Sequence, residues 1–535
     1  MTKLSRRSIL ERLILSGHEI SPDALELLLS LPSPMDFIDS VIFGSESGCP
    51  MIITKEFITN HSMDVSGIAS SSTSIPHSKE SSTDESDSPP PSTNEWNILV
   101  LKNPSADLVG SGGTAEDFLK LFQDRFRRIQ KIYMRRIKTQ TASSPAALKK
   151  MKGDSKMRRA MAREGKYRSR PTSHMTIGMI TSKRESKSKN IILELEDPEG
   201  SITCIVPMNR SGPDGKTLVE KGNALMLDEV VCISGIVDEY GRLIANDVIY
   251  PDIPVVRSIT RAKNDVYASF ISDLHFGSEE FLEDSFDAFI DWLRGIDVDA
   301  SDKRMNQQIR YLFIAGDIVD GIGVYPGQER NLLVPDIYEQ YKLFAKKLRD
   351  VPPHIKIICI PGNHDACRQA LPKPPIPEEF AKPLYELDNQ ILMLGDPCIV
   401  AVEGTNILVT HGDSLDDLVT NIPGASYRRP EIPMIELLRK RHLAPLYGAK
   451  TELAPLSQDW MVLDSPPDVV HFGHAHHNAV DEYRNVQIIN SGTFQGQTDF
   501  MRKQGIVPTP GIVTFLNLRD GYPSVKTFYD FSKMH

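Results

Sequence analysis

The chain has 535 residues, more than the roughly 100 to 200 of a typical domain, so the sequence predicts two or three domains. Apolar residues make up 40% and charged residues 25%, as in an ordinary globular protein with room for a large core. Because 71 acidic residues outnumber 61 basic ones, the formal net charge is −10, which excludes nucleic-acid binding through overall charge. A surface that binds a polyanion must therefore be local.

Cysteine usage and hydropathy point to a reducing, aqueous compartment. The six cysteines, at positions 49, 204, 232, 359, 367 and 398, form no CxxC pair. The opening segment carries Glu11 and Arg12 inside its apolar stretch, and no later run reaches the roughly 18 to 20 apolar residues of a membrane span. We expect a soluble cytoplasmic protein with reduced thiols, without disulfides and without a cysteine-based zinc site.

The N-terminal part has the pattern of a small helical module over residues 1–60. Residues 4–16 carry apolar side chains at helical spacing before Gly17, and Ser21 and Pro22 form a start signal for a helix over residues 24–31. Such a module packs or docks a partner. Residues 61–95 are rich in Ser, Thr, Pro and Asp, with too few apolar side chains to offset the entropy of ordering, and are predicted to be a disordered linker.

Residues 96–170 are predicted to be a helical and basic segment. Between Leu121 and Arg170 there are 17 basic and three acidic residues, and residues 125–136 have helical spacing. A concentrated positive stretch in an acidic chain suits binding to phosphates, although a solvated loop explains the same charges. The residues predicted to contact DNA are Arg125, Arg127, Arg128, Arg135 and Arg136.

Residues 171–255 have the pattern of a series of short strands separated by turns. A short helix is predicted at residues 218–221, between the third and fourth strands. Five strands with a helix before the fourth predict an OB-type β-barrel, which binds single-stranded nucleic acid or docks another protein. The predicted strands are residues 175–180, 190–195, 201–206, 229–237 and 243–249.

From residue 256 to the end, strands and helices alternate, which predicts a layered α/β domain. Helices are expected near residues 286–293 and 337–348. The whole chain is thus predicted to be a multidomain α/β protein, in which a small helical module and an OB-type barrel precede this domain. Its expected strands are residues 266–272, 311–315, 355–360, 391–394, 407–410, 469–472, 486–489 and 512–516.

Polar motifs follow five of these strands, mostly with a glycine beside the polar residue. Open α/β sheets place ligands at the carboxyl ends of their strands, so the motifs are expected to line one pocket. Carboxylate, amide and imidazole ligands without a thiolate suit Mn, Fe, Zn or Mg, and a shared carboxylate such as that of Asp317 can bridge two ions. The motifs are Asp273-Leu274-His275, Gly316-Asp317-Ile318-Val319-Asp320, Gly362-Asn363-His364-Asp365, Thr410-His411-Gly412-Asp413 and Gly473-His474-Ala475-His476.

This ordered set resembles the calcineurin-like metallophosphoesterases across residues 266 to about 520. The resemblance implies that His364 protonates the leaving oxygen or stabilises the transition state, that Asp365 orients His364, and that His477 lies outside the ligand set. It also implies two divalent ions. One would be held by Asp273, His275, Asp317 and His476, and the other by Asp317, Asn363, His411 and His474.

The order of the predicted domains resembles the family of small subunits of archaeal family-D DNA polymerase, as do residues 20–25, 492–498 and 505–511. The resemblance implies a manganese-dependent 3′–5′ exonuclease, with Mg²⁺, Fe or Zn as alternative metals. It would act on single-stranded 3′ ends of DNA and serve a large catalytic polymerase subunit as proofreader. Every ligand position is filled, which favours an active enzyme.

Two other functions stay open from the sequence. One is a phosphomonoesterase that acts on nucleotides or proteins, and the other is a non-catalytic subunit that only assembles the polymerase. The linker and the basic insert after Ile137 are less typical of the family. Residues 427–429 and 439–442, between the fourth and fifth motifs, are interpreted either as part of a substrate-binding loop or as solvated helix charges.

Overall fold

The computed structural model describes residues 19–20, 27–28, 52–53, 96–151, 172–387 and 390–531. The chain divides into two compact units, one of residues 1–89 with 254–258 and one of the remainder. In the first, β1 (Glu19–Ile20) pairs in parallel with β2 (Ile52–Ile53). The helix predicted at 4–16 and the linker at 61–95 lie outside the described residues; of the helix predicted at 24–31, Leu27 and Leu28 are described and are helical.

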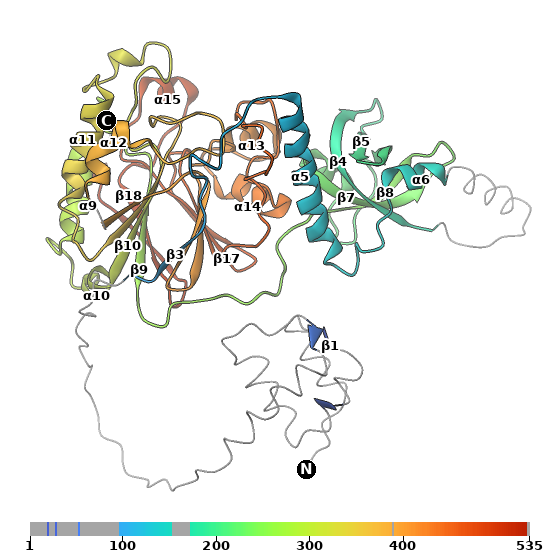
Figure 1. Ribbon diagram of the computed structural model, residues 1–535, viewed down its shortest axis with the longest axis horizontal. Coiled ribbons are helices and arrows are strands. Elements are labelled where there is room, and N and C mark those ends of the chain that lie inside the picture. The colour runs from blue at the N-terminus through green and yellow to red at the C-terminus, as the bar shows by residue number, and fades with distance from the viewer. Residues whose placement is uncertain are drawn as a thin grey trace, which may run out of the picture. The chain divides into compact units, whose positions relative to one another are not determined.

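The second unit contains a closed barrel of five strands (Figure 1). The strands lie where the sequence predicts them, and they close in the order β4-β5-β6-β8-β7. Alternate residues point inward, as Ile191, Leu193 and Leu195 do in β5. The predicted intervening helix is α8 (Leu218–Asn223), which starts at a capping box. The strands are β4 (His174–Glu185), β5 (Ile191–Asp197), β6 (Gly200–Val206), β7 (Val230–Val237) and β8 (Leu243–Ile249).

Two six-stranded sheets make up the α/β region. The first has the strand order β12-β11-β10-β9-β18-β19. Strands β9 to β12 run parallel to one another, β18 pairs antiparallel with β9, and β19 pairs antiparallel with β18. This arrangement leaves the carboxyl ends of β9, β10 and β11 side by side. The strands are β9 (Tyr267–Ile271), β10 (Ile309–Ala315), β11 (Lys356–Ile360), β12 (Ile391–Met393), β18 (Ile512–Asn517) and β19 (Pro523–Thr527).

The second sheet has the order β16-β17-β15-β14-β13-β3. Its edge strand β3 comes from the segment for which only helical and basic character was predicted. One apolar cluster contains side chains from both sheets, such as Phe313 of β10 and Val409 of β14. The strands are β3 (Ile98–Lys102), β13 (Cys398–Val402), β14 (Thr405–Val409), β15 (Val469–Phe472), β16 (Ala479–Tyr483) and β17 (Val486–Asn490).

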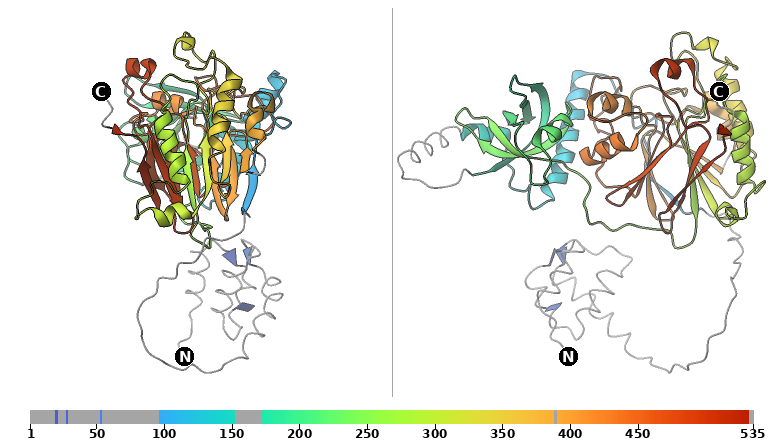
Figure 2. Two further views of the ribbon diagram at one scale, coloured as in Figure 1. Left: turned by 90° about the vertical axis from the view of Figure 1, so that its left-hand side faces the viewer. Right: turned by 180° about the vertical axis from the view of Figure 1, so that it is seen from behind.

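Helices cover the outer sides of the sheets, with α9 and α11 beside the first sheet and α13 and α14 beside the second (Figures 1 and 2). No helix among the described residues is long and apolar enough to cross a membrane. The helices of this region are α9 (Glu283–Leu293), α10 (Lys303–Gln307), α11 (Ile337–Leu348), α12 (Glu378–Tyr385), α13 (Leu415–Asn421), α14 (Glu431–Lys440) and α15 (Asp499–Gln504), with a 3₁₀ turn at Gln328–Arg330.

The long helix α5 (Ala115–Met134) lies between the barrel and the α/β region (Figure 1). On the barrel side, the Tyr133 hydroxyl donates to the carbonyl of Ile249 at 2.7 Å and accepts from the backbone N–H of Cys232. On the other side, Arg125 forms an ion pair of 2.7 Å with Asp459. The short helix α6 (Pro145–Lys150) then buries Leu148 in the barrel core. Helix α5 therefore fixes the barrel to the domain that carries the polar motifs.

Candidate metal centre

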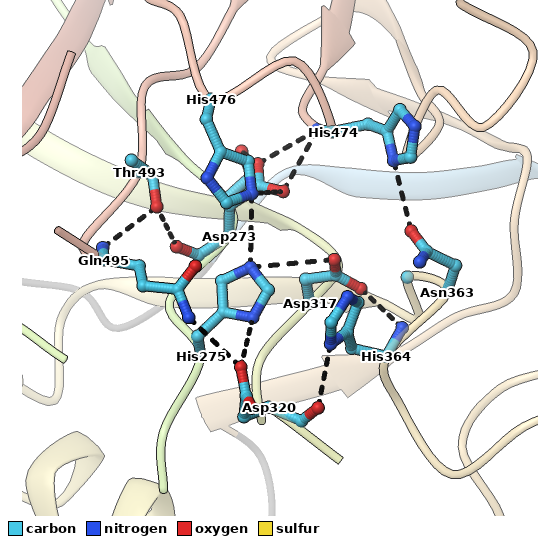
Figure 3. Close-up of polar contacts among 12 residues, drawn as sticks. Asp273, His275, Asp317, Asp320, Asn363, His364, His474, His476, Thr493 and Gln495 are labelled. Carbon is cyan, nitrogen blue, oxygen red and sulfur yellow. Dashed lines mark hydrogen bonds and ion pairs between the residues drawn. The ribbon is translucent and has the colours of Figure 1, made fainter. Parts of the chain in front are cut away.

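The five polar motifs meet at one edge of the two sheets. Each begins within one or two residues after the end of β9, β10, β11, β14 or β15. Several groups of three His and Asp residues have ligand atoms within 4.8 Å of one another. Figure 3 shows the side chains converging from separate loops. The structure thus brings together all seven residues predicted to be ligands, which are Asp273, His275, Asp317, Asn363, His411, His474 and His476.

The backbone of this cluster is strained at five of those positions. Asp273, His275, Asp317, His474 and His476 have φ angles between 50° and 66°. Residues other than glycine rarely adopt this left-handed conformation, which costs roughly 1 to 3 kcal/mol each and is found mostly at functional sites. Hydrogen bonds between the loops hold it, for example from the N–H of His275 to the carbonyl of Asp317 at 3.0 Å. The fold therefore forces these side chains inward.

Glycine at position 362 lets two of the loops approach each other. A Cβ atom there would lie 2.1 Å from Oδ1 of Asp317, a distance that no side chain can occupy. The same Oδ1 accepts the backbone N–H of His364 at 2.8 Å. Gly362 thus leaves the space that the Asp317 carboxylate occupies.

The first group of ligand atoms contains two imidazoles that face each other. His275 Nε2 lies 3.2 Å from His476 Nε2, which is itself 3.4 Å from Asp273 Oδ1. His275 Nδ1 lies 3.0 Å from Oδ1 of Asp320, so Nδ1 carries the hydrogen and donates it. The lone pair of His275 Nε2 therefore points toward His476, and Asp317 Oδ2 lies 3.8 Å from the same nitrogen. These atoms are arranged as ligands around a common point.

The second group shows the same pattern. His411 Nδ1 lies 2.8 Å from the carbonyl oxygen of Ala315 and must donate to it. In the neutral ring, its Nε2 then presents a lone pair to two oxygens, Asn363 Oδ1 at 2.9 Å and Asp317 Oδ2 at 3.4 Å. His474 Nδ1 lies 3.1 Å from the same Asn363 oxygen. Acceptor atoms face acceptor atoms here, an arrangement that a bound cation would satisfy, so the residues fit a metal.

The electrostatics agree with this fit. Burial raises the pKa of Asp317, but His411 and His364 outweigh that effect and hold it well below its usual range. Burial lowers the pKa of His411, whereas Asp317 and Asp273 raise it to about 10. The carboxylates therefore stabilise positive charge at the centre of the cluster, which a proton or a metal cation can supply.

His364 is half-buried beside the cluster. Its Nδ1 lies 2.8 Å from the carbonyl oxygen of Asp320, so Nδ1 donates and Nε2 is left without a hydrogen bond among the described residues. The prediction that Asp365 orients His364 is wrong. The Asp365 carboxylate instead accepts from the N–H of Gly362 at 2.8 Å and from the Tyr341 hydroxyl at 3.0 Å. Asp365 points toward backbone amides and holds the loop, while Asp320 contacts His364.

Sequence reasoning assigned no role to several residues that support the predicted ligands. Asp320 contacts His275, and Gln328 and Gln495 donate to its two oxygens at 3.0 and 3.1 Å. Asp416 lies 3.0 Å from His474 Nε2 and accepts from the Tyr427 hydroxyl at 2.8 Å. Asp320 ends the Gly-Asp-Ile-Val-Asp motif, which was a usable signal. Asp416 and Gln495 carry no local signal.

The structure corrects the predicted DNA-contacting arginines. Arg125 is 0% exposed and donates to Asp459 and to the backbone carbonyls of Asp228 and Pro445, so it cannot reach a phosphate. The charge of Arg125 holds the barrel and the α/β region together.

Of the other predicted arginines, three are also paired with protein groups. Arg128 forms ion pairs with Asp124 and Asp464, and Arg136 donates to the carbonyls of Tyr250 and Asp252. Arg127 is exposed and forms an ion pair with Asp124, and Arg135 is exposed. The remaining basic residues at 152–170 lie outside the described residues. Helical spacing identified the helix but not its long-range partners.

Residues 268–480 match the family of the B subunits of DNA polymerases alpha and epsilon. This match places the α/β region in a class of polymerase accessory subunits. The particular family follows from curated relatives, each named DNA polymerase II small subunit. Identity is 44% with the protein of Methanothermobacter thermautotrophicus, over 64% of this chain and 69% of the relative. It is 34% with that of Archaeoglobus fulgidus, over 95% of both chains. This chain belongs to the family of archaeal DNA polymerase II small subunits.

Other similar proteins match over less of their length or with lower identity. The relative from Pyrococcus horikoshii is 37% identical over 81% of this chain, and the alignment spans 66% of that protein, slightly less than two thirds. Among solved structures, an archaeal phosphodiesterase aligns with 14% identity over 49% of this chain and 99% of that chain, with a TM-score of 0.24. That score is too low to support an inference.

Proposed function

We propose that this chain is a metal-dependent 3′–5′ exonuclease that proofreads for a polymerase by hydrolysing DNA phosphodiester bonds. One observation carries the proposal: oxygen and nitrogen atoms of buried and half-buried Asp, Asn and His side chains face one another in a chain that belongs to a polymerase small-subunit family. The proposed partners are a large catalytic polymerase subunit and single-stranded 3′ ends of DNA. We further propose two divalent ions, Mn²⁺ before Mg²⁺, Fe or Zn, because the donor set contains oxygen and imidazole nitrogen but no thiolate.

The proposed ligand sets are those that the sequence suggests, with Asp317 shared between the two ions. Bound metals would polarise the phosphodiester and supply hydroxide near neutral pH. Asp320 fixes the ring of His275, and Asp416 fixes the ring of His474, each through the nitrogen that faces away from the cluster. The protein therefore orients both imidazoles before substrate binds.

His364 is proposed to exchange a proton with the leaving oxygen through Nε2. Its Nδ1 is held by the Asp320 carbonyl, and its backbone N–H is held by Asp317. The ring is thus fixed against the cluster, with its second nitrogen available to substrate. A 5′-labelled single-stranded oligonucleotide should be shortened from its 3′ end by the wild-type chain with Mn²⁺ and not with EDTA. His364→Ala should lower this rate by about 100-fold.

His354 provides a matched control because it is a histidine that is half-buried like His364. Its backbone carbonyl accepts the Trp96 indole N–H, a bond that replacement of the side chain leaves in place. His354→Ala should cut DNA like wild type. Hydrolysis of p-nitrophenyl phosphate without hydrolysis of DNA would support the phosphomonoesterase instead. Full exonuclease activity in His364→Ala, within the complex, would support a non-catalytic assembly role.

The barrel is proposed to be of the OB type, because its helix lies between the third and fourth strands and its strands close in the order β4-β5-β6-β8-β7. The region after it is proposed to be a layered metallophosphoesterase domain. The burial of Arg125 against Asp459 ties the two together, which suits a subunit that presents one rigid surface to a large partner.

A further inference from the structure

A single segment crosses the edge where the candidate ligands lie. The rim segment, residues 492–511, leaves the second sheet after β17 and enters the first sheet at β18. One end is attached to the cluster by Thr493, whose hydroxyl donates to the carbonyl of Asp273 at 2.7 Å. The other end is attached by Thr509, whose N–H donates to the carbonyl of His476 at 2.9 Å. Both anchors are backbone atoms of proposed ligand residues.

Between these anchors the rim segment is held in place by its own contacts. Gln495 donates to Asp320 at 3.1 Å, and Gln497 donates to the carbonyl of Ile506 at 2.6 Å. Helix α15 begins at Thr498, whose hydroxyl accepts the N–H of Met501, and Met501 is buried beneath it. Figure 1 shows α15 beyond one end of the two sheets, and the polar motifs follow the carboxyl ends of the strands. The helix is therefore a fixed part of the rim.

Helix α15 presents an aromatic ring to solvent at this place. Phe500 is 61% exposed, the largest exposure of any phenylalanine in the part of the chain that the structure describes. Val507, later in the rim segment, is 45% exposed. An exposed ring on a segment that is anchored at both ends to proposed ligand residues offers a flat apolar surface on which a nucleobase can stack.

Two exposed cations lie on or against the rim segment. A third cation, Arg502, forms an ion pair of 2.6 Å with Asp499, which neutralises its charge. Lys503 is exposed and forms no ion pair among the described residues. Arg428 is exposed and donates to the carbonyl of Gly505 at 3.1 Å. Arg428 thus lies against the rim segment.

We propose that Phe500, Lys503 and Arg428 bind the unpaired 3′ strand of DNA as it enters the candidate metal centre. A base stacks on Phe500, and Lys503 and Arg428 neutralise the phosphates on either side. This inference rests on the proposed function and names where its substrate binds. The attachment to Asp273 and His476, together with the two cations, favours a nucleic-acid strand over an apolar protein segment.

The test measures binding of a 5′-fluorescein-labelled oligothymidylate to the full chain by fluorescence anisotropy, with EDTA present so that nothing is cut. Phe500→Ala should weaken binding about 10-fold, and Phe500→Trp should restore it. Tyr522→Ala is the matched control, because Tyr522 is 74% exposed in the turn between β18 and β19 and should not affect binding. Equal affinities for Phe500→Ala and Tyr522→Ala would overturn the proposal.

A second variant tests the cations separately. Replacing Arg428 and Lys503 together by glutamine should reduce the slope of log Kd against log salt concentration by about 1.4, as expected for two phosphate contacts on a single strand. If the slope did not change, neither Arg428 nor Lys503 would contact the phosphates of the bound strand.

Hydrolysis assays separate this proposal from the proposed function. The wild-type chain and Tyr522→Ala should hydrolyse bis(p-nitrophenyl) phosphate with Mn²⁺ at the same rate, because that small diester needs no stacking surface. If the wild-type chain cuts neither substrate, the exonuclease proposal fails, while the anisotropy still decides the binding surface. If Phe500→Ala binds DNA normally but loses the large subunit, the ring belongs to a protein interface and this proposal is wrong.

Discussion

Two buried charged regions of this molecule look alike in composition and differ in hydrogen bonding. At the α5 junction, His442 Nε2 donates to Asp459 at 2.9 Å, and its Nδ1 accepts the N–H of Ala444 at 3.1 Å. Each ring nitrogen thus has a complementary partner. In the candidate metal centre, His275 Nε2 instead faces another imidazole nitrogen, and His411 Nε2 faces two oxygens.

The difference shows which buried charges suggest chemistry. Both regions gather largely buried residues from distant parts of the chain, so burial and charge do not distinguish them. Complementary donors and acceptors around His442 make the junction a structural tie. The facing ring nitrogens and oxygens, combined with five left-handed residues, make the other cluster one that a cation would fit.

The largest effect is expected from Asp317→Asn, which separates function from stability. DNA hydrolysis should fall by at least about 100-fold, because the oxygen shared by both ligand groups is lost. The melting temperature in EDTA should fall by no more than a few degrees, since the amide can still accept the N–H of His364. A variant that retains activity would contradict the shared role of Asp317.

The junction should behave in the opposite way. Asp459→Ala leaves the Arg125 guanidinium buried without its partner and should cost about 3 to 5 kcal/mol of unfolding free energy. The protein that remains folded should bind Mn²⁺ like wild type. The control is Arg127→Ala, whose side chain is 76% exposed and should have little effect on stability. Urea denaturation with a parallel metal titration checks both statements.

The junction also predicts how stability depends on pH. Burial and the charge of Arg125 lower the pKa of His442 to about 4, whereas it titrates near 6.5 in the unfolded chain. Between these values the unfolded chain binds the extra proton, so stability should fall as pH drops from 6.5 to 4, by on the order of 3 kcal/mol. His442→Gln should flatten this part of the curve of melting temperature against pH. If the curves of wild type and His442→Gln ran parallel between pH 6.5 and pH 4, His442 would not be the group that lowers stability there.

A smaller effect is expected when a residue that orients a ligand is changed. Asp320→Asn weakens the hold on His275 Nδ1 and should reduce Mn²⁺ affinity by about 10- to 100-fold without changing the number of ions bound. Isothermal titration with Mn²⁺ gives both quantities. If Asp320→Asn bound Mn²⁺ with the affinity of wild type, the role of Asp320 would be limited to stabilising its own loop.

Part of this arrangement could be predicted from the sequence. Apolar strands that end in Gly, Asp, Asn or His predicted the motifs at one sheet edge, and the seven predicted ligands do lie together. The barrel strands and α8 followed from alternation and turns. These features are local, because strand period and strand-end chemistry are encoded within a few residues.

Other features depend on contacts that no local pattern encodes. Arg125 has its partner 334 residues away, so its helix looked like a basic surface. The short apolar run at residues 98–101 is typical of a strand, but β3 pairs with β13, which lies far later in the chain and which no local pattern identifies as its partner. The family resemblance implies that Asp365 orients His364, yet the Asp365 carboxylate turns toward Gly362 and Tyr341.

Counting bound metal tests the central claim most directly. The chain, stripped with EDTA and dialysed against Mn²⁺, should retain two ions per molecule by elemental analysis. Asp317→Asn, which changes the atom between both ligand groups, should retain fewer, and Asp459→Asn should retain two in its folded fraction. A wild-type chain that retains no ion, or an Asp317→Asn variant that retains as many as wild type, would contradict the account.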